Sequence, residues 1–174
     1  MKTIKNRKSL SPQEREEVIQ KIKTLDLSKI KMKLMSKRSE PVSQETADEA
    51  EKWYKRFLIL NIMYPDKAIV PTTLIDTMWH YHILDTQKYA HDCENVFGFF
   101  FHHYPYFGLL SEEDAQNSKN AFDESMVLFD LVFKEMPMVN KNLVLLSESC
   151  KESCSSTDCT DATPPECYSS CSSK

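Results

Sequence analysis

The sequence predicts a mostly α-helical protein: a single compact helical domain with a basic N-terminal helical arm and a disordered Cys/Ser-rich C-terminal tail. Apolar residues recur at helical spacing in several segments, whereas the alternating stretches typical of strands are few. Only two glycines occur in 174 residues, which disfavours a turn-rich β protein. A hydrophobic fraction of 41% and a charged fraction of 28% are those of a globular protein, so we expect one core.

The basic arm is expected to span residues 1–40. Ser11 and Pro12 combine an N-cap with a first-turn proline, and they predict a helix that runs to about Leu25. Lysine alternates with apolar residues in segment 29–35, and this period of two favours a short strand or an extended arm.

The helical core domain is expected to span residues 41–146. Ser43 can cap its first helix, in which apolar residues share one face. Thr73 and Asp76 have the spacing of a capping box, which predicts that the next helix starts at Thr73.

Two more helices follow in this domain. Asp85 or Thr86 can cap the first of them, and Gly98 suits the left-handed position that often ends a helix. An aromatic run comes next, and Ser111 then opens a last long helix.

Residues 147–174 form the predicted tail. Its Ser, Cys, Thr, Asp and Pro residues bury too little apolar surface to offset the entropy of ordering, so we expect a flexible segment. In a reducing cytosol, clustered thiols are better suited to soft-metal binding or modification than to stabilising a fold, although a solubilising spacer is an alternative. Five of the six cysteines lie in this tail: Cys150, Cys154, Cys159, Cys167 and Cys171.

Charge is distributed unevenly along the chain. Residues 1–38 hold 12 of the 22 Lys and Arg residues and four acidic residues, a net charge of +8, whereas residues 39–146 carry −9. This pattern favours a solvated helical arm that docks on the acidic body over one that holds nucleic acid or anionic lipid.

Several functional classes lack their sequence signals. We find no nucleotide-binding loop, no Ser-His-Asp arrangement and no basic-aromatic pattern of RNA-binding sheets, so nucleic acid is not an expected partner. No stretch has the length and apolarity of a secretory signal or a membrane span. We therefore expect a cytoplasmic protein without a membrane span.

All five histidines fall between positions 80 and 103, which indicates a functional site because neutral imidazole is the commonest metal ligand. Asp76 and His80 are four apart and share a helix face, whereas His80 and His82 lie roughly 200° apart on a helix. Zn²⁺ or Fe²⁺ would suit such a cluster. The candidate ligands are Asp76, His80, His82, Cys93, His102 and His103, while His91 is expected at the surface. Alternatively, these side chains are hydrogen-bonded polar members of an aromatic core.

Residues 43–108 contain a set of distinctive motifs: Tyr54-x-x-Phe57-Leu58, Val70-Pro71, Asp76-x-x-Trp79-His80-x-His82-Ile83-Leu84, Tyr89-x-x-x-Cys93, Phe97-Gly98 and His102-His103-x-Pro105-Tyr106. In these motifs the region resembles the glycine-rich domain-containing protein-like family of plants and bacteria. The resemblance implies that the same six polar residues are the candidate site, but it implies no reaction. Many bacterial relatives end in glycine- and cysteine-rich tails, and this chain keeps the cysteine without the glycine.

Three functional hypotheses follow. The first is a metal-binding helical domain whose Cys-rich tail captures or transfers a soft metal, with His80, His82, Cys93 and His102 as its best ligands. The second is a metal-dependent enzyme that modifies its own tail or a related peptide. The third is a non-catalytic protein-interaction module, which would bury the histidines against aromatic residues without a cavity.

Overall fold

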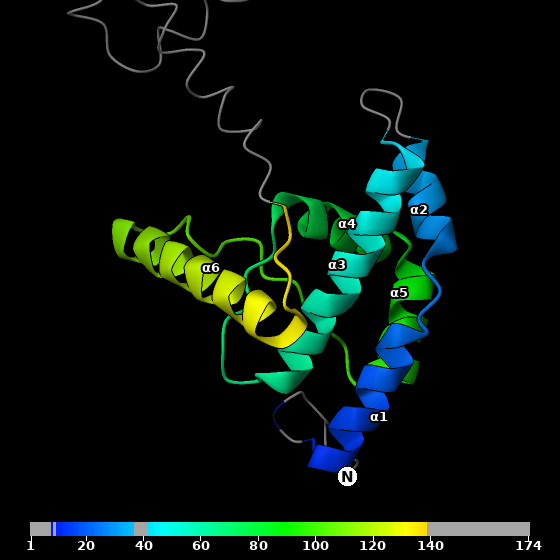
Figure 1. The fold of residues 1–174 in the computed structure, drawn as a ribbon, viewed down its shortest axis with the longest axis horizontal. Coiled ribbons are helices and arrows are strands. Elements are labelled where there is room, and N and C mark those ends of the chain that lie inside the picture. The colour runs from blue at the N-terminus through cyan, green and yellow to red at the C-terminus, as the bar shows by residue number, and fades with distance from the viewer. Residues whose placement is uncertain (1–7, 9, 37–41, 139–174) are drawn as a thin grey trace, which may run out of the picture. The chain divides into compact units, whose positions relative to one another are not determined.

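The computed structural model describes residues 8, 10–36 and 42–138, and helices account for most of these residues (Figure 1). The described residues contain no strand, so the prediction of a mostly α-helical fold is confirmed. The predicted tail and its five cysteines lie outside the described residues. In chain order the elements are α1 (Pro12–Lys23), α2 (Ser28–Met35), α3 (Gln44–Met63), α4 (Thr73–Leu84), α5 (Thr86–Asp92), the π-helix η2 (Cys93–Phe97) and α6 (Glu112–Phe133).

Helix α2 corrects the prediction of a strand or extended arm in segment 29–35. A strand would place Ile30, Met32 and Leu34 on one face. In the structure Ile30 and Leu34, four apart, are buried, whereas Met32 is 62% exposed. The alternation was therefore misleading, because the same apolar residues also have helical spacing and pack in that form.

The described part of the predicted basic arm, which forms α1 and α2, packs against the rest of the described domain. Helix α1 begins at the predicted cap, with a capping box between Ser11 and Glu14, and its buried Val18 and Ile22 face the core. Helices α1 and α2 both contact α3. The Lys31 ammonium of α2 lies 2.8 Å from Asp48 and 2.6 Å from a second carboxylate of α3, so basic and acidic segments do meet here.

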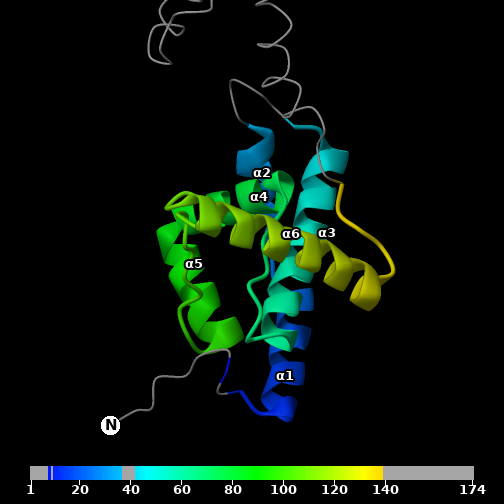
Figure 2. The ribbon, with the colours of Figure 1, turned by 90° about the vertical axis from the view of Figure 1, so that its left-hand side faces the viewer.

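Helix α3 is the centre of the packing (Figure 1). Its Ser43 cap accepts a hydrogen bond from the Thr46 amide, as predicted. Helix α6 crosses α3 (Figure 2). The Trp53 ring of α3 and the Phe129 ring of α6 meet edge to face at 5.6 Å. Beyond α6, the hydrogen bond from Arg56 lowers the pKa of Glu135 to about 2.

Helix α4 begins at Thr73, as predicted, although Thr72 is its N-cap and makes no side-chain cap bond. The Thr73–Asp76 capping box is therefore not formed, and the Asp76 carboxylate is free to contact a distant segment. Asp85 caps α5, and Gly98 adopts the expected left-handed conformation with φ +73°. None of the described helices combines the length and apolarity needed to cross a bilayer.

Two connecting segments join the α4 region to α6. Segment 68–72 leads into α4, and its Val70 amide donates a 2.9 Å hydrogen bond to the Ser125 hydroxyl of α6. Segment 99–108 returns from η2 and ends where the Gly108 amide donates to Asp114 at 2.6 Å. Gly108 has φ +92°, and a Cβ there would lie only 2.9 Å from the Ser118 Cβ, so glycine is required at this close approach.

Candidate metal centre

Helix α4 supplies the first two residues of the candidate site. Asp76 and His80 are one helical turn apart, and the His80 Nε2 lies 3.7 Å from an Asp76 carboxylate oxygen. The helix continues to Leu84, so the unwinding that would bring His82 to the same side as His80 does not occur. This pair is the one that the sequence spacing predicted.

The third residue comes from the chain after Gly98. Side chains alternate along this non-helical segment, so Phe101 is buried, His102 is exposed and His103 turns toward α4. The His103 Nε2 lies 3.0 Å from an Asp76 carboxylate oxygen and 3.2 Å from the His80 Nε2. Its ring also packs on Trp79, with ring centroids 4.4 Å apart.

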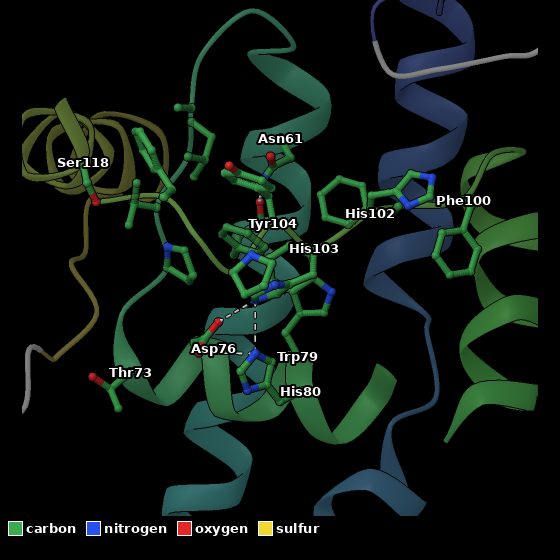
Figure 3. Close-up of a pocket in the computed structure, with 18 of the residues that line it drawn as sticks. Asn61, Thr73, Asp76, Trp79, His80, Phe100, His102, His103, Tyr104 and Ser118 are labelled. Carbon is green, nitrogen blue, oxygen red and sulfur yellow. Dashed lines mark hydrogen bonds and ion pairs between the residues drawn. The ribbon is translucent and has the colours of Figure 1, made fainter. Parts of the chain in front are cut away.

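The three side chains offer ligand atoms that lie within 4.8 Å of one another (Figure 3). Two ligands bound to one tetrahedral Zn²⁺ at 2.0–2.1 Å would be about 3.3 Å apart. The His103 Nε2 lies close to this distance from both the His80 Nε2 and the Asp76 Oδ1, at 3.2 and 3.0 Å, whereas the His80 Nε2 lies 3.7 Å from the other oxygen, Asp76 Oδ2. The Nε2 of His103 carries at most one hydrogen, which would have to serve both Asp76 and His80. A single cation would satisfy all three groups at once.

The cluster lies at the edge of a pocket of about 780 Å³. The His80 side chain is 52% exposed, whereas those of Asp76 and His103 are less accessible. All three line the pocket together with residues from segments 68–71 and 99–107. An ion held by these three side chains would therefore keep coordination positions that face the pocket.

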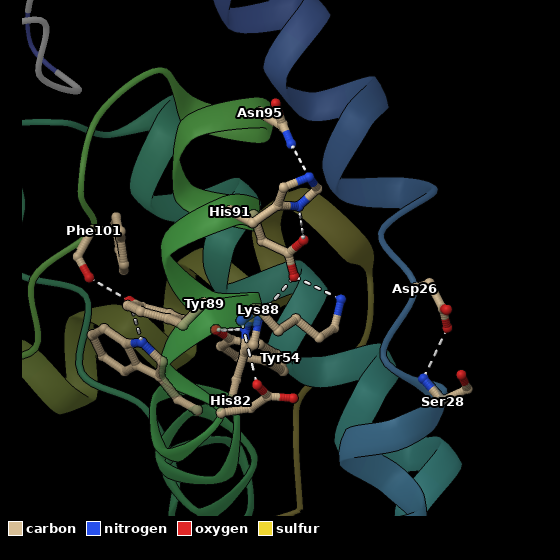
Figure 4. Close-up of polar contacts among 12 residues, drawn as sticks. Asp26, Ser28, Tyr54, His82, Lys88, Tyr89, His91, Asn95 and Phe101 are labelled. Atoms are coloured by element: carbon tan, nitrogen blue, oxygen red, sulfur yellow. Dashed lines mark hydrogen bonds and ion pairs between the residues drawn. The ribbon is translucent and has the colours of Figure 1, made fainter.

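His82 occupies a different environment, inside the helical core (Figure 4). Its Nδ1 lies 3.1 Å from the Tyr54 hydroxyl, and its Nε2 lies 2.9 Å from the Asp92 carboxylate. Burial raises the pKa of Tyr54 well above its usual value, so this hydroxyl stays protonated and donates to Nδ1. The His82 Nε2–H then donates to Asp92, and both ring nitrogens are engaged.

Burial also lowers the pKa of His82 below its usual value of 6.5, although the hydrogen bond to Asp92 opposes this shift. Burial alone would raise the pKa of Asp92, but hydrogen bonds from Lys88 and then His82 keep it below 3.8. The pair is therefore a neutral imidazole on an ionised carboxylate that Lys88 also contacts at 2.8 Å.

This network predicts a pH dependence of folding stability. The unfolded chain takes up a proton on His82 before the folded chain does, so stability from this group is complete above pH 6.5 and is lost as pH falls through the lowered folded pKa. Denaturant unfolding between pH 7.5 and 5.0, in chelator, should show a loss of at most about 1.4 kcal/mol per pH unit from this group. His82→Gln should flatten the profile, whereas exposed His91→Gln should not; equal slopes in all three proteins would contradict the assignment.

Two other predicted candidates, Cys93 and His102, also lie away from the cluster. Cys93 is a buried free thiol beside Tyr89, and burial raises its pKa. His102 packs against Phe100 at the pocket and does not join Asp76. His91 is exposed, as expected, and contacts Asn95. Of the six predicted ligands, the structure brings together Asp76, His80 and His103.

The sequence offered a hydrogen-bonded histidine in an aromatic core as an alternative, and His82 fits it, but the sequence did not identify the partners of His82. Tyr54 and His82 come from different helices, and their meeting depends on how α3 packs against α4. One local signal was present, because Lys88 and Asp92 are four apart and form a helical ion pair. The Tyr89 hydroxyl donates a hydrogen bond to the Phe101 carbonyl and accepts one from the Trp79 ring nitrogen. No sequence pattern predicted these two hydrogen bonds.

The fold and the cluster define an all-α domain that carries two histidines and one carboxylate at a pocket. Residues 14–125, more than half of the chain, match the UCP032817-like family, and the chain belongs to this uncharacterised family. The matched region contains the whole cluster. Neither the curated proteins nor the solved structures contain a significant match to this chain.

Proposed function

We propose that this domain binds one divalent transition-metal ion, Zn²⁺ or Fe²⁺, through Asp76, His80 and His103. The observation that carries the proposal is the convergence of two imidazole nitrogens and a carboxylate at the spacing of ligands around one ion. Two histidines and one carboxylate form a recurrent ligand set for both metals. The interaction-module hypothesis is less well supported, because it expected buried histidines without a cavity.

The tail extends this proposal. We assign its five cysteines to the capture or transfer of a soft metal, since thiolates bind such ions well. We also propose that the chain is related to the glycine-rich domain-containing protein-like family. Its tail shares cysteines with the tails of bacterial members but lacks their glycines, so the proposed role of the tail rests on the cysteines alone.

A metal-dependent enzyme is the second candidate function. Catalytic sites commonly use three protein ligands and leave a position for water or substrate, and the open side of this cluster faces a pocket. The proposed substrate is the Cys-rich tail or a related peptide. Intact-mass analysis of the full chain expressed with metal should then show a tail modification that His80→Ala abolishes; an unmodified tail in both proteins would count against this candidate.

The experiment that tests the primary proposal must separate the cluster from the tail thiols. We would use a full-length tail-serine chain with Cys150→Ser, Cys154→Ser, Cys159→Ser, Cys167→Ser and Cys171→Ser. Purified without chelator, it should contain close to one Zn or Fe per chain by elemental analysis, and His80→Ala in the same background should contain almost none. Equal metal content in the two proteins, or none in either after addition of Zn²⁺ and Fe²⁺, would refute the proposal.

A further inference from the structure

The pocket beside the cluster has features that metal binding alone does not explain. Its volume of about 780 Å³ lies within the range of small-molecule sites. Asp76, His80 and His103 need only one ion between them, so most of the pocket extends beyond the metal centre. The remaining walls are the segments 68–71 and 99–107, with parts of α3, α4 and α6.

The chemistry of these walls is predominantly apolar and aromatic. Phe57 and Trp79 form part of the inner wall, where their rings are 5.1 Å apart. No Lys or Arg lines the pocket among the residues that the structure describes, and Asp76 is the single carboxylate of that lining. Phosphorylated and polyanionic ligands therefore find no cationic side chain here other than histidine.

Two aromatic side chains at the pocket are left open to solvent. Phe100 and Tyr104 both line it, yet each exposes half of its surface or more. Exposed apolar rings that border a concave site are typical of ligand-binding grooves, because a bound apolar group would remove their surface from water. In Figure 3, Tyr104 lies near the Asp76–His103–His80 contacts, and Phe100 lies farther along the same segment beside His102.

We propose that this pocket binds a small molecule with an uncharged, ring-sized apolar body and a head group that chelates the metal through two oxygen atoms. The inference rests on the proposed function, since the ion supplies the anchor for the head group. Three protein ligands leave room for such a chelator on Zn²⁺ or Fe²⁺. The aromatic walls then recognise the body, and the ion fixes its orientation.

Two hydroxamates test the inference, because they share the chelating group and differ only in their bodies. The protein is the zinc-loaded tail-serine chain, and the probes are benzohydroxamate and acetohydroxamate, measured by calorimetric titration. Benzohydroxamate should bind at least about tenfold more tightly, since its phenyl ring is buried against the aromatic walls. Both should lose measurable binding when the zinc is removed.

Ala68→Phe supplies a pocket-filling variant, because Ala68 is an exposed residue of the pocket lining and tolerates a larger side chain. It should reduce the benzohydroxamate preference to below about threefold while acetohydroxamate binds as before. Ala90→Phe, on the exposed part of α5 outside the lining, is the matched control and should keep the full preference.

The outcomes separate this inference from the metal proposal. Stoichiometric zinc with equal affinity for the two hydroxamates, or with no binding of either, would overturn the small-molecule site and leave the metal site intact. An undiminished preference in Ala68→Phe would also overturn it. Absence of zinc from the chain, which elemental analysis detects before any hydroxamate is added, would overturn both.

Discussion

His103→Ala should lower the affinity of the tail-serine chain for Zn²⁺ by at least about 100-fold, because loss of a residue that merely supports a ligand already costs 10–100-fold. The reason is geometric: the His103 Nε2 lies 3.0 Å from Asp76 and 3.2 Å from the His80 Nε2, so it completes the set of three. The measurement is competition with a zinc-binding dye at pH 7.5.

The neighbouring residue supplies the control for this prediction. His102→Ala changes the same side-chain type one position earlier, but His102 packs against Phe100 and lies apart from the cluster. Its zinc affinity should stay within about threefold of the parent chain. A comparable loss in both variants would show that the affinity depends on the number of histidines rather than on the cluster. His80→Ala is a second test that does not depend on the folding of the His103 variant, because it removes a ligand at a half-exposed position.

Phe129→Ala should destabilise the domain by about 3–5 kcal/mol, the usual cost of removing a buried aromatic ring and leaving a cavity. Phe129 is 0% exposed and meets the Trp53 ring of α3 edge to face, so it fixes α6 on the central helix. Denaturant unfolding followed by circular dichroism measures the change in the free energy of unfolding.

A residue on the same helix tests whether this cost reflects packing. Leu131 is 57% exposed, and Leu131→Ala should change the free energy of unfolding by less than about 0.5 kcal/mol. Helix α6 also accepts a hydrogen bond from the Val70 amide and lines the pocket through Ser118. Phe129→Ala should therefore also lower the affinity for zinc. Equal stability of the two variants would contradict the role given to Phe129.

Much of the helical architecture could be predicted because its signals are local. Ser11, Ser43 and Ser111 cap helices where their spacing predicted, and Asp85 does the same for α5. Segment 29–35 was the exception, since its alternating pattern fits a strand and a helix equally, and burial of two residues four apart decided the outcome. The π-helix η2 had no recognisable sequence signal.

The candidate site could be predicted only in part, because only one pair of its residues is close together in the sequence. Asp76 and His80 belong to one helix, so their spacing was sufficient. The choice of His103 over His102 depends on the path of the chain after Gly98, which tertiary packing fixes. Likewise, the separation of His82 depends on its burial against Tyr54 of another helix. Contacts between residues that are far apart in the sequence leave no local spacing pattern from which they could be predicted.

X-ray absorption spectroscopy of the zinc-loaded tail-serine chain tests the central claim most directly. We expect one zinc per chain, with a first shell of nitrogen and oxygen ligands at about 2.0–2.1 Å and the outer-shell signature of two imidazoles. His103→Ala should reduce that signature to one imidazole in any zinc that remains. A sulfur shell at about 2.3 Å from Cys93, or an imidazole signature that survives unchanged in His103→Ala, would contradict the proposed site.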